Sequence, residues 1–256
     1  MPKLEETLFG IAFLVFLHWP FTIPGSRYGI KGAVGGFLGT KPLICGGMKV
    51  QYDKDLKEYS DEYSDKCLLI TPKKTEKLRI MQSKRFNAAS LVLKGSILWV
   101  TGGNDGTNTL SSTEFIENKA TGGPELPKRL EGHKMIGITD DLTLLIGGGY
   151  LKEATHEKTQ IATTYYFNHD KTQHEKGIWS EGPPMQYKRR NHAVGIVTDR
   201  ITLEKVVFVT GGEGEVGQLK STEKLDTSWS EGESLLMSLK IGKYPFTIFD
   251  CLQILS

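Results

Sequence analysis

Leu98-Trp99-Val100-Thr101-Gly102-Gly103 is a short apolar run that stops on two glycines, and this pattern decides the fold. β-Branched and aromatic residues favour strands, and glycine allows the positive φ that a chain adopts where a strand ends. Three other runs stop in the same way: Leu43-Ile44-Cys45-Gly46-Gly47, Leu144-Leu145-Ile146-Gly147-Gly148 and Val207-Phe208-Val209-Thr210-Gly211-Gly212. Four strands that each end in a glycine doublet predict a repeat protein. Its structural repeat glycines are Gly46, Gly47, Gly102, Gly103, Gly147, Gly148, Gly211 and Gly212.

The composition is typical of a folded all-β chain. Of the 256 residues, 38% are hydrophobic and 24% are charged, which is unlike a disordered protein. The 29 glycines exceed the usual share of ~7%, and so favour many turns between short strands. The formal net charge of +2 arises from 32 basic and 30 acidic residues. This balance gives no electrostatic footprint for nucleic acid, and we expect none to be bound.

Three internal matches define the repeat. Residues 101–116 match residues 210–225 at a constant offset, which aligns Glu114 with Glu223. Met81-Gln82-x-Lys84-Arg85-x-Asn87 matches Met185-Gln186-x-Lys188-Arg189-x-Asn191, and Trp179-Ser180-Glu181-Gly182 matches Trp229-Ser230-Glu231-Gly232. These matches predict units of four short strands. We expect strands one and two to be buried on both faces, because they are continuously apolar, and the more polar strand three to lie further out.

The pattern resembles the kelch repeat and hence the kelch and galactose-oxidase-like β-propellers. The glycine doublets, Trp179, Trp229 and the basic turns before each first strand carry this resemblance over residues 33–250. It implies a kelch-type β-propeller with about four four-stranded blades, at 33–85, 86–130, 131–190 and 191–240, and a partial fifth at 242–250. Residues 1–32 carry no repeat.

The family usually has five to seven blades, so the count of four leaves several outcomes open. The propeller is open, or it closes with the N-terminal segment, or the sequence is part of a longer product. An open propeller would expose apolar blade edges, through which the chain could associate with itself.

The N-terminus contains an unbroken apolar run at residues 8–17 (LFGIAFLVFL). The run is too short to span a bilayer, which needs ~20 residues, so no transmembrane span is expected. Its length suits the core of a signal peptide, which would make the protein secreted. Glu5 and Glu6 make the flank poor for that role, and the alternative is a hydrophobic strand of a cytoplasmic protein.

Cys45 and Cys67 lie on two strands expected to be adjacent and antiparallel. Such strands can bring two cysteines within bonding distance, so a disulfide forms here if the compartment is oxidising. The alternative is a pair of buried free thiols. No spacing of cysteines and histidines typical of a zinc site occurs, and we expect no metal and no cofactor.

No residue set predicts catalysis. His133 and His192 take equivalent places in the repeat, as do Glu114 and Glu223, and a structural group recurs whereas a catalytic group is needed once. Galactose-oxidase-like copper chemistry needs two tyrosines beside histidines, and Tyr165 and Tyr166 have no such partners in sequence. The cluster at 188–190 (KRR) is interpreted as a solvated loop or a ligand contact.

The expected function is therefore that of a non-enzymatic scaffold that binds another protein through propeller loops, for which 48–64 and 150–162 are the longest candidates. One alternative is a carbohydrate-binding or galactose-oxidase-like propeller. The other is a partial propeller without independent function.

Overall fold

The computed structural model describes residues 21–22, 29–53, 58–71, 75–117, 119–152, 157–170, 172, 176–198, 205–225, 229–231, 238–241 and 244–247. All regular structure in these ranges is β-strand, so the prediction of an all-β chain is confirmed. No helix in these ranges is long and apolar enough to cross a membrane. The apolar run at 8–17 lies outside the described residues.

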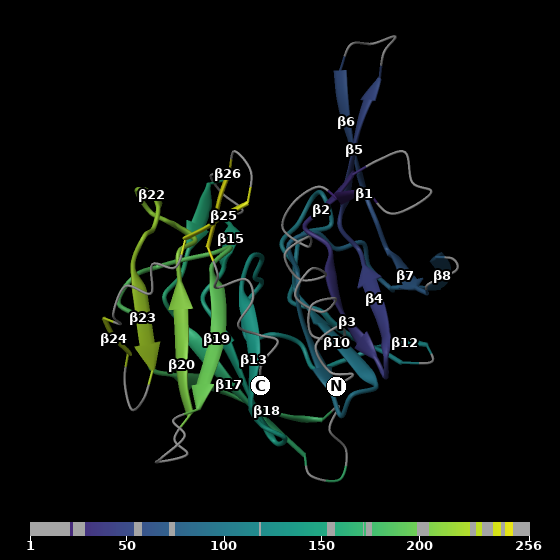
Figure 1. Cartoon of the computed structure of the whole chain (residues 1–256). Coiled ribbons are helices and arrows are strands. Elements are labelled where there is room, and N and C mark those ends of the chain that lie inside the picture. Colours follow the sequence, from purple (N-terminus) through teal and green to yellow (C-terminus); the bar gives the residue numbers. More distant parts are fainter. Residues whose placement is uncertain are drawn as a thin grey trace, which may run out of the picture.

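Four antiparallel sheets, each of four strands in chain order, make up the body of the molecule (Figure 1). Sheet I contains β3 (Val34–Leu38), β4 (Lys41–Cys45), β7 (Lys66–Ile70) and β8 (Thr75–Ile80). Sheet II contains β9 (Ala89–Leu93), β10 (Ile97–Thr101), β11 (Thr113–Ile116) and β12 (Ala120–Gly122). Sheet III contains β13 (Lys134–Thr139), β14 (Leu142–Ile146), β17 (Thr164–His169) and β18 (Gly177–Gly182). Sheet IV contains β19 (Ala193–Thr198), β20 (Lys205–Thr210), β23 (Thr222–Leu225) and β24 (Trp229–Glu231). Their first strands lie side by side in the order β3, β9, β13, β19.

Smaller strand pairs interrupt the connection between the second and third strands. The insertion of sheet I is the hairpin β5 (Met48–Asp53) and β6 (Glu58–Tyr63), which extends a sheet begun by β1 (Phe21–Thr22) and β2 (Gly29–Lys31). Sheet III carries β15 (Gly149–Leu151) with β16 (Lys158–Gln160), and sheet IV carries β21 (Glu213–Gly214) with β22 (Gly217–Gln218). The segments 48–64 and 150–162, expected to be long loops, are therefore largely hairpins.

The range expected to begin a fifth unit, 242–250, contains β26 (Tyr244–Thr247). Among the described strands β26 pairs with β25 (Ser238–Ile241) alone. The remainder of that range lies outside the described residues.

Apolar cores lie between successive sheets. Because successive side chains of a strand point to opposite faces, the second strand of a sheet contributes residues to the cores on both of its faces. Leu98 and Val100 of β10 pack into the core shared with sheet I. Trp99 points the other way, into the core shared with sheet III, where it meets Phe167 at 5.0 Å and Trp179 at 5.8 Å between ring centroids. Aromatic pairs at these distances add stabilisation beyond the area they bury. Trp179 thus packs between neighbouring units.

Each glycine of the Gly102-Gly103 doublet lies too close to a different neighbouring turn to carry a side chain. A Cβ on Gly102 would stand 2.4 Å from the carbonyl oxygen of Leu130, in the turn that leads into sheet III. A Cβ on Gly103 would stand 2.9 Å from the carbonyl oxygen of Phe86, in the turn that leads into its own sheet II. Both have positive φ, 55° and 94°. The first glycine therefore allows contact with the following unit, and the second allows contact with its own.

Hydrogen bonds join each doublet to the next lead-in turn. Gly47 donates its N–H to the Arg85 carbonyl at 2.7 Å, and Gly103 donates to the Leu130 carbonyl at 2.8 Å. Gly148 donates to the Arg189 carbonyl at 2.8 Å. Gly46 and Gly147 approach these same turns as Gly102 does, with φ of 68° and 57°. In sheet IV, Gly212 packs on its own turn, whereas among the described residues a Cβ on Gly211 would have only the Leu219 carbonyl oxygen within 4 Å, at 3.8 Å.

Two buried ion pairs hold the lead-in turns of sheets II and IV. The Arg85 guanidinium donates to Glu114 Oε1 at 2.8 Å and to the Gly102 carbonyl at 2.8 Å. Glu114 also accepts the N–H of Gln82 at 2.7 Å. Arg189 and Glu223 repeat this geometry at 2.7 Å, and all four side chains are almost completely buried. The recurring glutamates thus have a structural role, as expected.

Strand three lies further out than strands one and two, as expected, but the expected burial of the first strand on both faces needs correction. Every residue of β11, the third strand of sheet II, is buried, whereas the first strands are only partly buried. Its charged residue, Glu114, is buried because Arg85 and backbone N–H groups satisfy its carboxylate. Composition alone could not show this, because a glutamate is usually exposed.

A disulfide joins Cys45 of β4 to Cys67 of β7. The two residues are directly opposite in the antiparallel register, and both are completely buried. Of the two alternatives left by the sequence, the structure has the disulfide. The bond cross-links the second and third strands of sheet I.

Replacing Arg85 with Met should lower the free energy of unfolding by about 3–5 kcal/mol, because the Glu114 carboxylate would remain buried without its partner. Lys84→Met is the matched control: it removes an exposed cation from the same turn and should change stability by about 0.5 kcal/mol or less. Urea unfolding followed by tryptophan fluorescence measures both. Equal losses for the two variants would contradict a structural role for the pair.

Gly102→Ala should destabilise by about 3–4 kcal/mol, since the methyl group adds a clash with the Leu130 carbonyl to the cost of positive φ. Gly211→Ala has the same doublet position and a similar φ of 65°, but no close neighbour among the described residues, and should cost only about 1–2 kcal/mol. Thermal and urea unfolding compare the two. A Gly211→Ala variant as unstable as Gly102→Ala would show that the doublet does not act through contact with the next unit.

Candidate functional site

The lead-in turns of the four sheets meet along one line. In each turn, the residue two positions before the first strand has positive φ: 62° at Gly32, 53° at Asn87, 65° at Gly132 and 53° at Asn191. Asn87 donates its N–H to the Gly32 carbonyl at 2.9 Å, Gly132 donates to Asn87 at 2.7 Å, and Asn191 donates to Gly132 at 2.7 Å. This series of hydrogen bonds brings segments more than 150 residues apart to one place.

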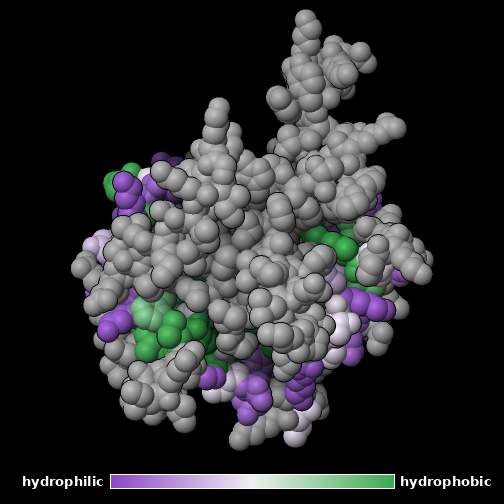
Figure 2. All heavy atoms as spheres, in the orientation of Figure 1, coloured by the Kyte–Doolittle hydropathy of each residue, from purple (hydrophilic) through white to green (hydrophobic). Residues whose placement is uncertain are grey.

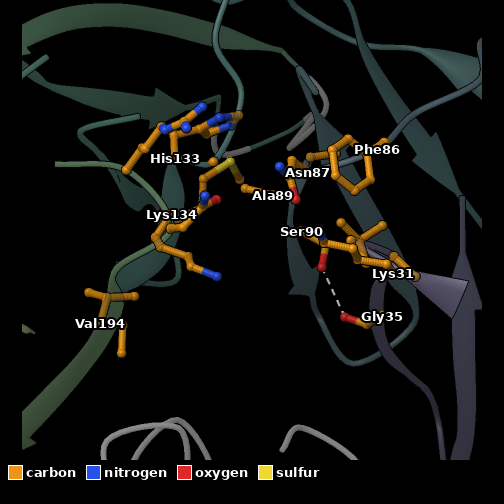
Figure 3. A pocket seen from close by; sticks show the side chains of 18 of the residues that line it. Lys31, Gly35, Phe86, Asn87, Ala89, Ser90, His133, Lys134 and Val194 are labelled. Atoms are coloured by element: carbon orange, nitrogen blue, oxygen red, sulfur yellow. Dashed lines mark hydrogen bonds between the residues drawn. The ribbon is translucent and has the colours of Figure 1, made fainter. Parts of the chain in front are cut away.

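A cavity of about 410 Å³ opens beside this series. Its walls are the lead-in turns and the first strands, and small residues such as Ala33, Gly35, Ala88 and Ala89 keep it wide. In Figure 3, His133, Lys134 and Val194 lie on one side of the open space, and Lys31, Gly35 and Ser90 lie on the other. Ser90 Oγ donates to the Gly35 carbonyl at 2.9 Å, which binds sheet II to sheet I at the cavity wall.

Charged side chains form a network of ion pairs in the cavity wall beside sheet IV. Arg190 donates to Glu213 Oε2 through Nε at 2.9 Å and to Glu131 Oε1 through Nη1 at 3.1 Å. Lys158 Nζ lies 3.7 Å from the same Glu131 oxygen. Glu131 is buried, so these two cations compensate a carboxylate that is removed from water. The network holds Arg190 in place on the wall.

His133 contacts the cavity but is not an acid–base group at neutral pH. It is completely buried, and its Nε2 lies 2.8 Å from Thr101 Oγ1 of sheet II. Burial, together with the nearby charge of Lys134, lowers the pKa of His133 to about 3. His192 takes the equivalent place in the lead-in turn of sheet IV and is also buried. The structural interpretation of His133 rests on its contact with Thr101, which joins the turn before sheet III to sheet II.

Tyr165 and Tyr166 are neighbours on β17 and point to opposite faces of sheet III. Tyr165 packs in the core shared with sheet II, and Tyr166 packs against the core shared with sheet IV. Burial raises the pKa of both phenols, and Glu181 adds to the effect at Tyr165. The strand geometry therefore keeps the two hydroxyls from converging on a single ion.

Within the described ranges no group of three histidine, cysteine, aspartate or glutamate side chains is arranged to hold a metal ion. The eight doublet glycines, Cys45 and Cys67 lie outside the cavity lining. They position the sheets rather than line the site.

The basic cluster at 188–190 separates into three roles. Lys188 is exposed and pairs with Glu215 at 2.6 Å, Arg189 is the buried partner of Glu223, and Arg190 lines the cavity. The interpretation as a solvated loop is therefore right for Lys188 and wrong for Arg189. The cavity residues Lys31, Lys134 and Lys158 had no signal in the sequence, because only the fold brings them together.

Lowering the pH should destabilise the protein through His133. Above about 6.5 the imidazole is neutral in both states; below this the unfolded chain binds a proton that the folded chain does not bind until about pH 3. This residue then costs up to about 1.4 kcal/mol of unfolding free energy for each pH unit. His133→Gln should be less stable at pH 7 but should show a shallower loss between pH 6.5 and 5, measured by urea unfolding. Identical pH slopes would contradict a neutral buried histidine.

Comparison with known proteins gives information on the fold of the chain and not on its chemistry. No protein-family model matches the chain, and no curated protein sequence matches it. Among solved structures it is similar to the one titled "Structure of YjhT", with a TM-score of 0.60 and 13% sequence identity. The match covers 81% of this chain and 70% of that chain. At this identity the similarity shows a shared all-β, propeller-like fold alone.

Proposed function

We propose that this protein is a non-enzymatic, kelch-type β-propeller scaffold that binds another protein through the hairpins on one face. The observation that carries the proposal is that the second-to-third strand connection bears a small antiparallel pairing in every sheet. These are β5–β6, the Asn104↔Thr109 bridge, β15–β16 and β21–β22. The framework around them repeats, whereas the hairpins differ in length and sequence, as expected where specificity resides.

The arrangement of the sheets supports the propeller part of the proposal. Four four-stranded antiparallel sheets stack through apolar cores, and their first strands run side by side around the cavity. We infer that they are four blades within residues 33–250, and that a partial fifth begins at 242–250. The glycine doublets and the Trp179 contact behave as a kelch-like repeat would require.

The hairpin face carries polar, exposed groups suited to a protein contact. Lys49 pairs with Glu62 across β5–β6, and Lys152 pairs with Glu157 beside β15–β16. Exposed pairs of this kind contribute little to stability, so their side chains can exchange partners at small cost. In Figure 1 the β5–β6 hairpin stands clear of the body, and β6 is the edge strand of its sheet among the described strands, so a partner strand can pair with it.

A second surface supports the expectation of self-association. Figure 2 shows an apolar patch over sheet IV. Val197 is 42% exposed, and Phe208 is half-buried on the side of β20 opposite Val207 and Val209. Leu43, Trp99 and Leu144 are equivalent to Phe208, three residues before their doublets, and all three are completely buried by the next sheet. No described strand buries Phe208 in the same way, and we propose this side of sheet IV as the surface through which a second copy binds.

The disulfide supports an oxidising location, because such bonds persist mainly in secreted proteins and secretory compartments. We therefore place the binding function outside the cell. Galactose-oxidase-like chemistry is disfavoured by the opposed directions of Tyr165 and Tyr166.

Photo-crosslinking tests the proposed face. A benzophenone amino acid at Glu62, Glu157 or Glu215, all exposed on the hairpins, should give an adduct of one defined mass in the producing cells. The matched controls are Thr40, Lys94 and Asp140, exposed in the turns at the opposite ends of the sheets, and should give none. Intact mass under non-reducing conditions confirms the oxidised chain in each sample. Equal adducts from both sets would overturn the hairpin face as the binding surface.

A further inference from the structure

The cavity is where the repeat stops being regular. The first residue of the first strand is Val34, Ala89 and Ala193 in three sheets, and Lys134 in sheet III. The residue before the positive-φ position is Lys31, Phe86 or Arg190 in the three turns where it lines the cavity, and Glu131, behind the wall, in the turn of sheet III. Residues needed for packing recur from unit to unit, as the glycine doublets do. The packing of the repeat does not explain residues that differ between units and yet line one cavity.

Cations dominate this irregular lining. Among the described residues of the lining, Lys31, Lys134, Lys158 and Arg190 are cations and Glu213 is a carboxylate. Glu131, behind the wall, pairs with Arg190 and Lys158, so these six side chains together keep an excess of two positive charges. They come from three different parts of the chain: the strand before sheet I, the start of sheet III with its hairpin, and the turn before sheet IV. In Figure 3 the Lys134 side chain projects into the open space, towards the side on which Lys31 lies. Walls of low polarisability concentrate the field of such charges inside a cleft.

We propose that the cavity is a binding site for a small organic anion that carries two or more carboxylate or phosphate groups. Its volume of about 410 Å³ falls within the usual range for a small-molecule site and excludes a folded partner. Lys31 and Lys134 engage the anion from opposite walls, while Glu131 and Glu213 hold the Arg190 side chain in place at the sheet IV end. This site is separate from the hairpin face proposed for protein binding.

The wall also explains why the ligand is polar rather than apolar. Asn87, Asn191 and Ser90 add amide and hydroxyl groups, while the small residues keep the backbone near the ligand. Because His133 is neutral and buried, it adds no charge of its own, and the affinity rests on the lysines. The site therefore binds its anion without acid–base chemistry from this histidine.

Isothermal titration calorimetry with citrate and, separately, with inorganic phosphate tests the site. The full chain should bind at least one of them saturably with one site per chain, and more weakly as salt is raised. The variant Lys31→Ala/Lys134→Ala should bind about tenfold more weakly or worse, because it removes two of the ammonium groups that donate charge-assisted hydrogen bonds to the anion. Citrate binding alone identifies a carboxylate site, and phosphate binding identifies an oxyanion site.

The control is Lys41→Ala/Lys220→Ala, which removes the same charge from exposed positions outside the cavity lining and should leave binding unchanged. Because Lys31 is exposed and Lys134 only half-buried, the test variant should remain folded, which its thermal unfolding midpoint shows. Absence of saturable binding of both anions to the unaltered protein would overturn the proposal. So would an equal loss in the two double variants, which would mean that net charge and not the cavity attracts the anion.

Discussion

The contact between a glycine amide and the backbone carbonyl of the next unit is the constraint on which the other contacts depend. Gly47, Gly103 and Gly148 each donate to the turn that leads into the following sheet, and the glycine before each lies too close to that turn for a side chain. The spacing of the sheets is thereby set by backbone and not by side chains. The apolar cores fill the remaining space, and the cavity follows from where the turns are held.

Two kinds of residue pair, ionic and apolar, occupy the equivalent place in the four sheets. The residue two places before the positive-φ residue meets a residue near the start of the third strand: Arg85 with Glu114 in sheet II, and Arg189 with Glu223 in sheet IV. In sheets I and III the positions hold Ile30 with Leu68 and Leu130 with Tyr165, and each pair belongs to one apolar cluster. A buried ion pair is about as stable as an apolar pair of similar size, but each is stable only when both members match.

This alternation explains how far the sequence could predict the structure. The glycine doublets showed the units, and the longest internal match joined sheets II and IV because both contain the ionic pair. The recurrence of Glu114 with Glu223 and of Arg85 with Arg189 is visible in the sequence, but the pairing of glutamate with arginine is not, since basic turns of this kind are typical of a solvated loop. The cavity could not be predicted, because Lys31 and Arg190 are far apart in sequence and meet only through the turns. The segment 48–64 was expected to be a loop because it is polar, and cross-strand pairing in β5–β6 overrides that composition.

The matched pairs have a consequence for how such a chain can change over generations. Arg85 and Glu114 lie within one unit, as do Arg189 and Glu223, and among the described residues no ion pair with both members this deeply buried joins two units. Between successive sheets from I to IV, the glycine N–H and the backbone carbonyl make a contact that does not depend on the side chains of the turn. A recombination event that duplicated or removed a whole unit would therefore carry both members of the pair with it and leave neither charge unmatched. Gene rearrangement can thus alter the number of units without separating either of these two ion pairs, while the lysines around the cavity, drawn from separate units, would be scattered by the same event.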